Sequence, residues 1–109
     1  MAIDVFKIKK NDKNPPIAVA LQYNDGTAVD LTDSTPYFIM AHRDYTPYFS
    51  GACVITGSAT GQVEYRWTGT TDTGSVGIFW GEFEVNWTGS KMTLPSDHNL
   101  QIHVYEDYN

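Results

Sequence analysis

The chain has 109 residues, of which 41% are hydrophobic, 14% aromatic and 18% charged, and its formal net charge at pH 7 is −6. A chain of this length and composition buries one hydrophobic core, so we expect a single domain over residues 1–109. The acidic balance argues against binding to nucleic acid or to acidic membrane surfaces, and no apolar run approaches the roughly 20 residues of a membrane helix. The amino terminus lacks the pattern of a secretory signal peptide, so we expect synthesis in the cytoplasm.

Short runs that alternate between apolar and polar residues recur along the chain, and glycine, proline or other turn residues separate them. This period of two is typical of half-buried β-strands. The predicted strands cover residues 3–8, 17–23, 28–32 (a brief extended piece), 37–42, 51–56, 63–67, 78–87, 91–94 and 100–105.

The connections carry the turn signals. Asn24-Asp25-Gly26 is the strongest of them, and residues 70–77 are small and polar, which favours a chain-reversing loop. Residues 43–50 are predicted to form an aromatic loop. Within residues 37–42 either Phe38 and Met40 or Tyr37 and Ile39 face the core, because alternation alone does not fix the register.

The longest alternating run, residues 78–87, organises the fold. One side of it carries Phe79, Phe83, Val85 and Trp87, and the other carries Glu82, Glu84 and Asn86. No segment has helical periodicity. Strands every ten to fifteen residues or so, with glycine-rich turns between them, predict an all-β fold, an antiparallel β-sandwich of about seven or eight strands.

In this order the chain resembles the amino-terminal module of siphophage baseplate upper proteins, over nearly its whole length. The residues that carry the resemblance are Asp25-Gly26, Val29-Asp30-Leu31-Thr32, Phe38, Met40, Gly61-Gln62-Val63-Glu64-Tyr65-Arg66-Trp67, Asp72-Thr73, Gly77-Ile78-Phe79, Glu82-Phe83-Glu84-Val85, Gly89-Ser90-Lys91 and Leu94-Pro95-Ser96. The chain departs from the pattern at Phe79, where a tyrosine is common. In immunoglobulin domains that tyrosine hydroxyl fixes the corner of the sandwich, and a phenylalanine cannot make its hydrogen bond.

The resemblance implies an immunoglobulin-like sandwich that serves as a structural connector in a phage tail or prophage tail. It implies that the partners are copies of the chain itself, as a homo-oligomer, and neighbouring tail or baseplate proteins, with the protein located in the virion. It carries no catalytic residue and no cofactor.

The residues themselves also predict no enzyme and no metal site. His42, His98 and His103 lack the spacing of metal ligands. Glu82 and Glu84 lie about 7 Å apart by strand rise, as glycosidase carboxylates can, but a solvated strand face explains them better. Cys53 excludes an intrachain disulfide because it is the only cysteine, and we expect it to be buried and inert.

Four aromatic residues lie outside the predicted core and form the candidate binding surface: Trp80, Tyr45, Tyr48 and Phe49. They fit a protein partner or, as the alternative, a cell-wall saccharide whose rings would stack on them. Two predicted edge strands, residues 3–8 and 91–94, would offer unpaired backbone to another chain.

Overall fold

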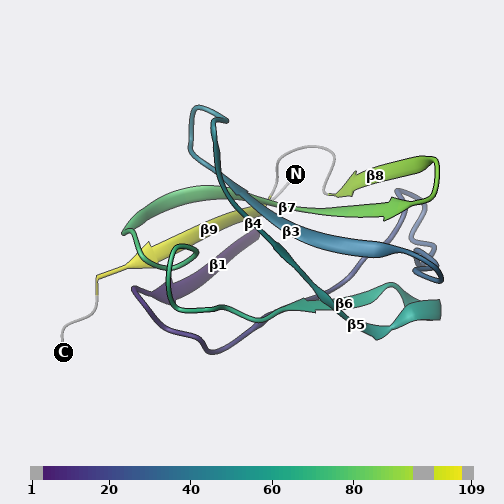
Figure 1. Ribbon diagram of the computed structural model, residues 1–109, viewed down its shortest axis with the longest axis horizontal. Helices are drawn as coiled ribbons and strands as arrows, with labels where there is room; N and C mark the ends of the chain where they lie inside the picture. Colours follow the sequence, from purple (N-terminus) through teal and green to yellow (C-terminus); the bar gives the residue numbers. More distant parts are fainter. Residues whose placement is uncertain (1–3, 95–99, 107–109) are drawn as a thin grey trace.

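The computed structural model describes residues 4–94 and 100–106, and these residues form nine β-strands and one turn of 3-10 helix (Figure 1). The elements are β1 (Asp4–Lys9), β2 (Ile17–Ala20), β3 (Thr35–Ala41), β4 (Pro47–Ala52), β5 (Val54–Gly57), η1 (Ser58–Thr60), β6 (Gln62–Tyr65), β7 (Gly77–Trp87), β8 (Ser90–Leu94) and β9 (Leu100–Tyr105). The all-β class predicted from the alternating runs is confirmed.

Two sheets face each other across one core. The large sheet has the order β1-β9-β7-β3-β4, with β8 also paired to β7, and the small sheet has the order β2-β6-β5. Strands β8 and β9 pair with successive parts of the same side of β7. These orders are those of the two sheets of an immunoglobulin-like sandwich, so that prediction is confirmed as well. The pairing of β1 with β9 is parallel, and all the other strand pairs are antiparallel.

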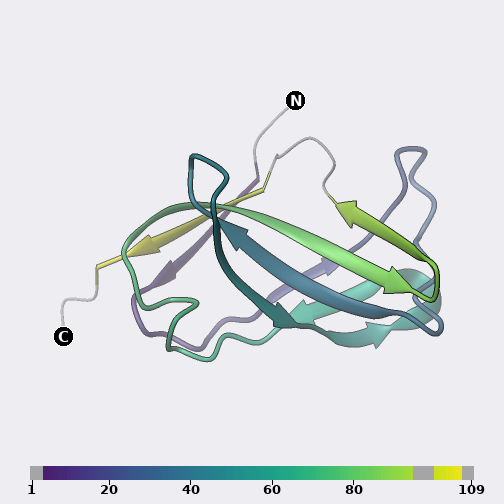
Figure 2. The same cartoon turned by 45° about the horizontal axis from the view of Figure 1, so that its top comes forward.

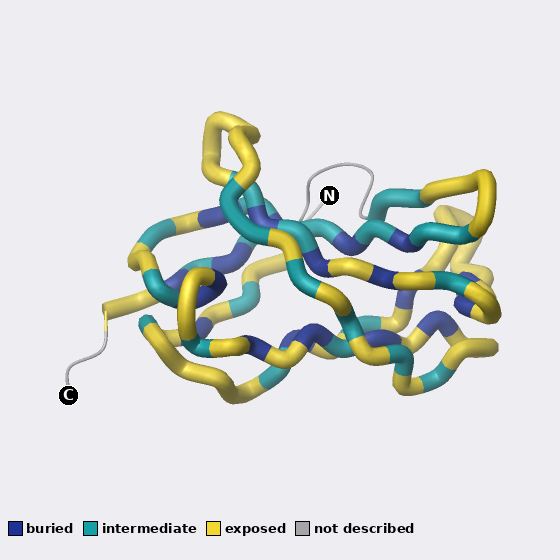
Figure 3. Tube along the Cα trace, viewed as in Figure 1, coloured by how far each residue is buried: buried dark blue, intermediate teal, exposed yellow. Residues whose placement is uncertain are grey.

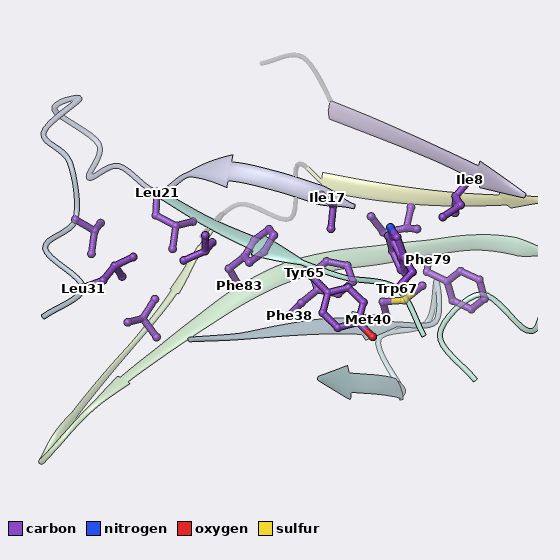
Figure 4. Packing of buried hydrophobic residues seen from close by; sticks show 14 of the residues in the cluster. Ile8, Ile17, Leu21, Leu31, Phe38, Met40, Tyr65, Trp67, Phe79 and Phe83 are labelled. Atoms are coloured by element: carbon purple, nitrogen blue, oxygen red, sulfur yellow. The ribbon is translucent and has the colours of Figure 1, made fainter. Parts of the chain in front are cut away.

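The core fills the space between the sheets with alternate side chains from both (Figure 4). Phe38 lies at its centre with no exposed surface, 5.0 Å from the Tyr65 ring and 5.2 Å from the Phe83 ring between centroids. Burial of a side chain of this size contributes about 1.5–3 kcal/mol. The contacts join β3 and β7 of the large sheet to β6 of the small sheet, so they hold the two layers together.

On the long strands β7 and β3, the side chains that face the core are alternate residues of the sequence. On β7, Phe79, Phe83 and Val85 are buried as predicted, and Trp87 is half-buried against the core. On β3 the structure selects one of the two registers that the sequence leaves open. Phe38 and Met40 are fully buried there, and Tyr37 is 37% exposed on the outer face.

The segment after β3 differs from its prediction. Residues 47–50, expected in a loop, belong to β4, and the predicted strand over residues 51–56 is divided at Cys53. The chain passes from the large sheet to the small sheet at this residue, whose backbone amide donates to the carbonyl of Pro36 at 2.9 Å. Cys53 is half-buried, not fully buried as expected.

The connection between β2 and β3 is irregular but buried where it crosses the sandwich. Val29 and Leu31 have no exposed surface, whereas the predicted extended piece forms only one bridge, between Gln22 and Ala28. Backbone hydrogen bonds attach this connection to the chain around η1, for example from the amide of Leu31 to the carbonyl of Ser58 at 2.8 Å. The predicted turn at residues 24–26 lies between the two bridged residues.

Candidate interaction surface

The hairpin between β3 and β4 projects from the body of the sandwich, and its tip is exposed (Figures 1 and 3). The amide of Tyr45 donates to the carbonyl of His42 at 2.8 Å, and the amide and hydroxyl of Thr46 donate to the Asp44 carboxylate at 3.1 and 2.6 Å. The hydrogen bonds from Thr46 lower the pKa of Asp44, since they stabilise its ionised form. The turn therefore has a defined shape, and Tyr45 sits at its tip with φ of 71°.

The hairpin places two side chains against Trp80, which points outward from β7. The Tyr45 ring lies parallel to the Trp80 ring, with centroids 6.0 Å apart and an interplanar angle of 4°. The guanidinium carbon of Arg43 lies 5.5 Å from the centroid of the Trp80 ring, and the indole N–H donates to the Arg43 carbonyl at 3.4 Å. We refer to Arg43, Tyr45 and Trp80 as the Trp80 patch. Tyr45 is 59% exposed, Arg43 is exposed as well, and Trp80 is half-buried.

The other two predicted binding residues lie on the inner side of the sheet. Tyr48 is half-buried and stacks on Phe79 at 4.5 Å, and Phe49 is half-buried with its ring edge toward Tyr65 at 5.9 Å. The pairing of β3 with β4 shifts at Tyr48, between the pairs Met40–Phe49 and Ala41–Pro47, and this bulge allows two successive rings to turn toward the core. Of the four predicted residues, the structure therefore brings together Trp80 and Tyr45 and places Tyr48 and Phe49 elsewhere.

Tyr48 and Tyr65 also supply corner hydrogen bonds of the kind that Phe79 cannot make. The hydroxyl of Tyr48 donates to the carbonyl of Thr71, and the hydroxyl of Tyr65 donates to the Asp72 carboxylate at 2.6 Å. Both acceptors lie in the loop between β6 and β7. Hydroxyls from two other strands therefore hold this loop to the sandwich.

Asp72 is the buried centre of that loop, with no exposed surface. Besides the Tyr65 hydroxyl, it accepts hydrogen bonds from the amide and hydroxyl of Thr68 at 2.7 and 2.9 Å and from the amide of Thr73 at 2.9 Å. Burial raises the pKa of Asp72, but these hydrogen bonds outweigh it and leave the pKa below its ordinary value. The alternation of polar and apolar residues does not predict this network, and its only signal in the sequence is a single aspartate among threonines.

Beyond the Trp80 patch, the outer face of the large sheet is part apolar and part charged. Val5 and Ile78 are 43% and 40% exposed on this face. Glu82 and Glu84 also lie on it, half-buried, and Glu84 is 3.8 Å from the ammonium of Lys91 and accepts from the Asn86 amide at 3.1 Å. These contacts match the solvated strand face expected for the two glutamates.

Across residues 4–94 and 100–106, no group of three or more His, Cys, Asp or Glu side chains is placed to hold a metal ion. His98 lies outside the described residues. Burial raises the pKa of the Cys53 thiol to about 12. The helical structure in the same ranges includes nothing with the length and apolar character needed to span a membrane.

None of the models of known protein families matches this chain, and no curated protein matches it either.

Proposed function

We propose that this protein is a non-enzymatic structural module that mediates protein–protein assembly in a phage or prophage tail. The observation that carries the assembly role is the Trp80 patch. Tryptophan, tyrosine and arginine are the residues most enriched at the energetic centres of protein interfaces, and here a tyrosine and an arginine of an exposed hairpin both lie against a tryptophan on a sheet face.

The tail or baseplate setting rests on the resemblance of the chain to baseplate upper protein modules. The immunoglobulin-like sandwich is compatible with that resemblance, since such modules act as connectors through their surfaces. The proposed partners are copies of the chain and neighbouring tail proteins within the virion. The acidic charge of −6 suits association with proteins better than with nucleic acid.

The packing of the patch favours a protein over a saccharide as the ligand. A sugar ring stacks on an open aromatic face. Both the Arg43 guanidinium and the Tyr45 ring contact the Trp80 ring, so the patch presents a compact group with a cationic edge. A protein surface can meet such a group with apolar and acidic side chains together.

The test replaces Trp80 and Tyr45 singly by Ala. Self-association is measured by sedimentation, and binding to neighbouring tail proteins and to purified cell-wall polysaccharide is measured in parallel. We expect each variant to weaken binding to the tail proteins at least about tenfold, which corresponds to about 1.4 kcal/mol. Tyr23→Ala is the matched control, because Tyr23 is a tyrosine of similar exposure, 45%, in a distant loop.

Polysaccharide binding that depends on Trp80 or Tyr45, with protein association unchanged, would replace this proposal by a carbohydrate-binding function. Equal effects of all three variants would also contradict it. Thermal unfolding of each variant verifies that the fold is retained.

A further inference from the structure

The edges of the two sheets differ in how they are protected against pairing with another chain. Strands β1 and β4 end the large sheet, and β2 and β5 end the small one. Lysine on an edge strand opposes such pairing, and β1 carries Lys7 and Lys9. Strand β8, whose described pairing is with β7 alone, carries Lys91. The two edges predicted for pairing from the sequence are thus the lysine-bearing ones.

Strands β4 and β5 form one uncharged edge along the opposite side of the sandwich. Residues 47–57 contain no Asp, Glu, Lys or Arg. Figure 2 shows β4 leading directly into β5. The two edge strands that follow each other here, one in each sheet, are therefore both free of charged side chains.

Strand β2 is also uncharged, but it is a poorer edge for pairing. It has only four residues, and Pro15 and Pro16, which lack amide hydrogens, come directly before it. Strand β4 has six residues with its one proline at the first position. Its outward-facing side chains, Ser50 and Ala52, are small and exposed, so another strand can approach closely.

Charge and symmetry favour a second copy as the occupant of this edge. Each copy carries a formal charge of −6, so two copies repel each other most weakly where their facing surfaces hold no charge. A strand that pairs antiparallel with its own copy across a two-fold axis is complementary to itself and closes the assembly as a dimer. We propose that β4 of one copy pairs antiparallel with β4 of a second copy, which joins the two large sheets into one.

This inference rests on the self-association within the proposed function and gives it a surface. The test compares Ser50→Lys with Asn24→Lys. Both changes add the same charge, but Asn24 lies in an exposed turn distant from β4. The first variant places two lysines beside each other at the paired edge, so we expect it to lower the dimer association constant at least about tenfold. We expect Asn24→Lys to leave that constant unchanged or to raise it, because it reduces the net charge.

Amide hydrogen exchange of the unmodified protein at low and high concentration provides a second readout that needs no variant. We expect the amides of β4 to become more protected at high concentration, and those of β1 to keep their rates. A dimer that survives Ser50→Lys, or one that protects β1 in place of β4, would overturn the edge proposal and leave the proposed function intact. A protein that stays monomeric at all concentrations overturns the edge proposal too, and the Trp80 and Tyr45 variants then decide the assembly role with tail proteins.

Discussion

Asp72 is the residue whose chemistry is most unusual for its position. A buried carboxylate is costly unless donors surround it, and here each of its oxygens accepts hydrogen bonds from the chain. Burial and the nearby carboxylate raise the pKa of Tyr65, so its hydroxyl remains a donor throughout the neutral range. The carboxylate thereby connects the end of β6 to the loop that leads into β7.

Asp72→Asn should destabilise the fold by about 1–3 kcal/mol at neutral pH, since the amide replaces an acceptor by a donor toward one of its partners. The folded pKa of Asp72 lies below its ordinary value of 3.8. Its stabilising contribution is therefore complete above that value and is lost as the pH falls through the lower folded pKa. Denaturant unfolding between pH 7 and pH 2, at intervals of about one unit, measures both effects.

Asp72→Asn should still lose part of its free energy of unfolding as the pH falls. Asp25, Asp30 and Asp44 also have lowered pKa values, through hydrogen bonds from threonines two residues later. Asp44→Asn is the matched control, because its carboxylate is exposed and accepts two hydrogen bonds within a single turn. A loss of stability in Asp44→Asn as large as in Asp72→Asn would show that burial of Asp72 contributes nothing.

At the scale of the elements, Gly61 lies just before β6, in close contact with the backbone of the connection between β2 and β3. Its φ is +69°, and its carbonyl accepts from the amide of Leu21 at 2.8 Å. A Cβ at this position would meet the backbone oxygen of Leu21 and would lie 3.0 Å from that of Val29. Because these are backbone atoms, no side-chain rotation relieves the contact.

Gly61→Ala should therefore lower the free energy of unfolding by about 2–5 kcal/mol, which is the sum of the penalty for a left-handed backbone and a penalty for overpacking. Gly26→Ala is the control, because Gly26 has φ of +87° with nothing within 4 Å of its Cβ position. Gly26→Ala should lower the free energy of unfolding by the backbone penalty alone, about 1–2 kcal/mol. Equal losses in denaturant unfolding would mean that the contact with the β2–β3 connection is not tight.

Most strands could be predicted from the sequence because they have one buried and one solvated face. On β7, aromatic and acidic residues alternate without interruption. Strand β4 could not be predicted this way, because a bulge turns both Tyr48 and Phe49 inward and removes the alternation from its sequence. The parallel pairing of β1 with β9 joins the two ends of the chain, and a pairing between distant segments leaves no local pattern.

The candidate surface was predictable in part, because alternation along a strand also shows which side chains face outward. The parity of Trp80 on β7 places it on the outer face, and the contact with Tyr45 follows from the hairpin that pairs β3 with β4. The binding position expected for Tyr48 and Phe49 depended on their lying in a loop, which they do not. The Asp72 network lies within residues 65–73, but its hydrogen bonds join side chains and backbone amides of an irregular loop, and alternation of polar and apolar residues contains no information about such contacts.

At the scale of the whole molecule, the few positive charges are unevenly placed. Lys7, Lys9, Lys10 and Lys13 are four of the seven Lys and Arg residues and lie within one short segment. Asp25, Asp30 and Asp33 lie in the connection between β2 and β3, toward the opposite end of the long axis (Figure 1). The molecule thus has a lysine-rich segment, which also holds Asp12, and an acidic connection, as well as the uncharged edge at β4 and β5. Two modes of self-association are distinguishable by charge: end-to-end contact through ion pairs, and edge-to-edge contact through backbone hydrogen bonds.

The sign of the salt dependence separates these two modes. Raising the ionic strength from about 10 mM to about 100 mM shortens the screening length from roughly 30 Å to roughly 10 Å. Pairing of uncharged edges between molecules of charge −6 should strengthen with salt, because only the repulsion is screened. We therefore expect the dimer association constant from sedimentation to rise severalfold over this range, and to rise likewise at low salt as the pH approaches the isoelectric point near 4.7. An association constant that falls with salt would instead indicate end-to-end contact between the lysine segment of one copy and the acidic connection of the next.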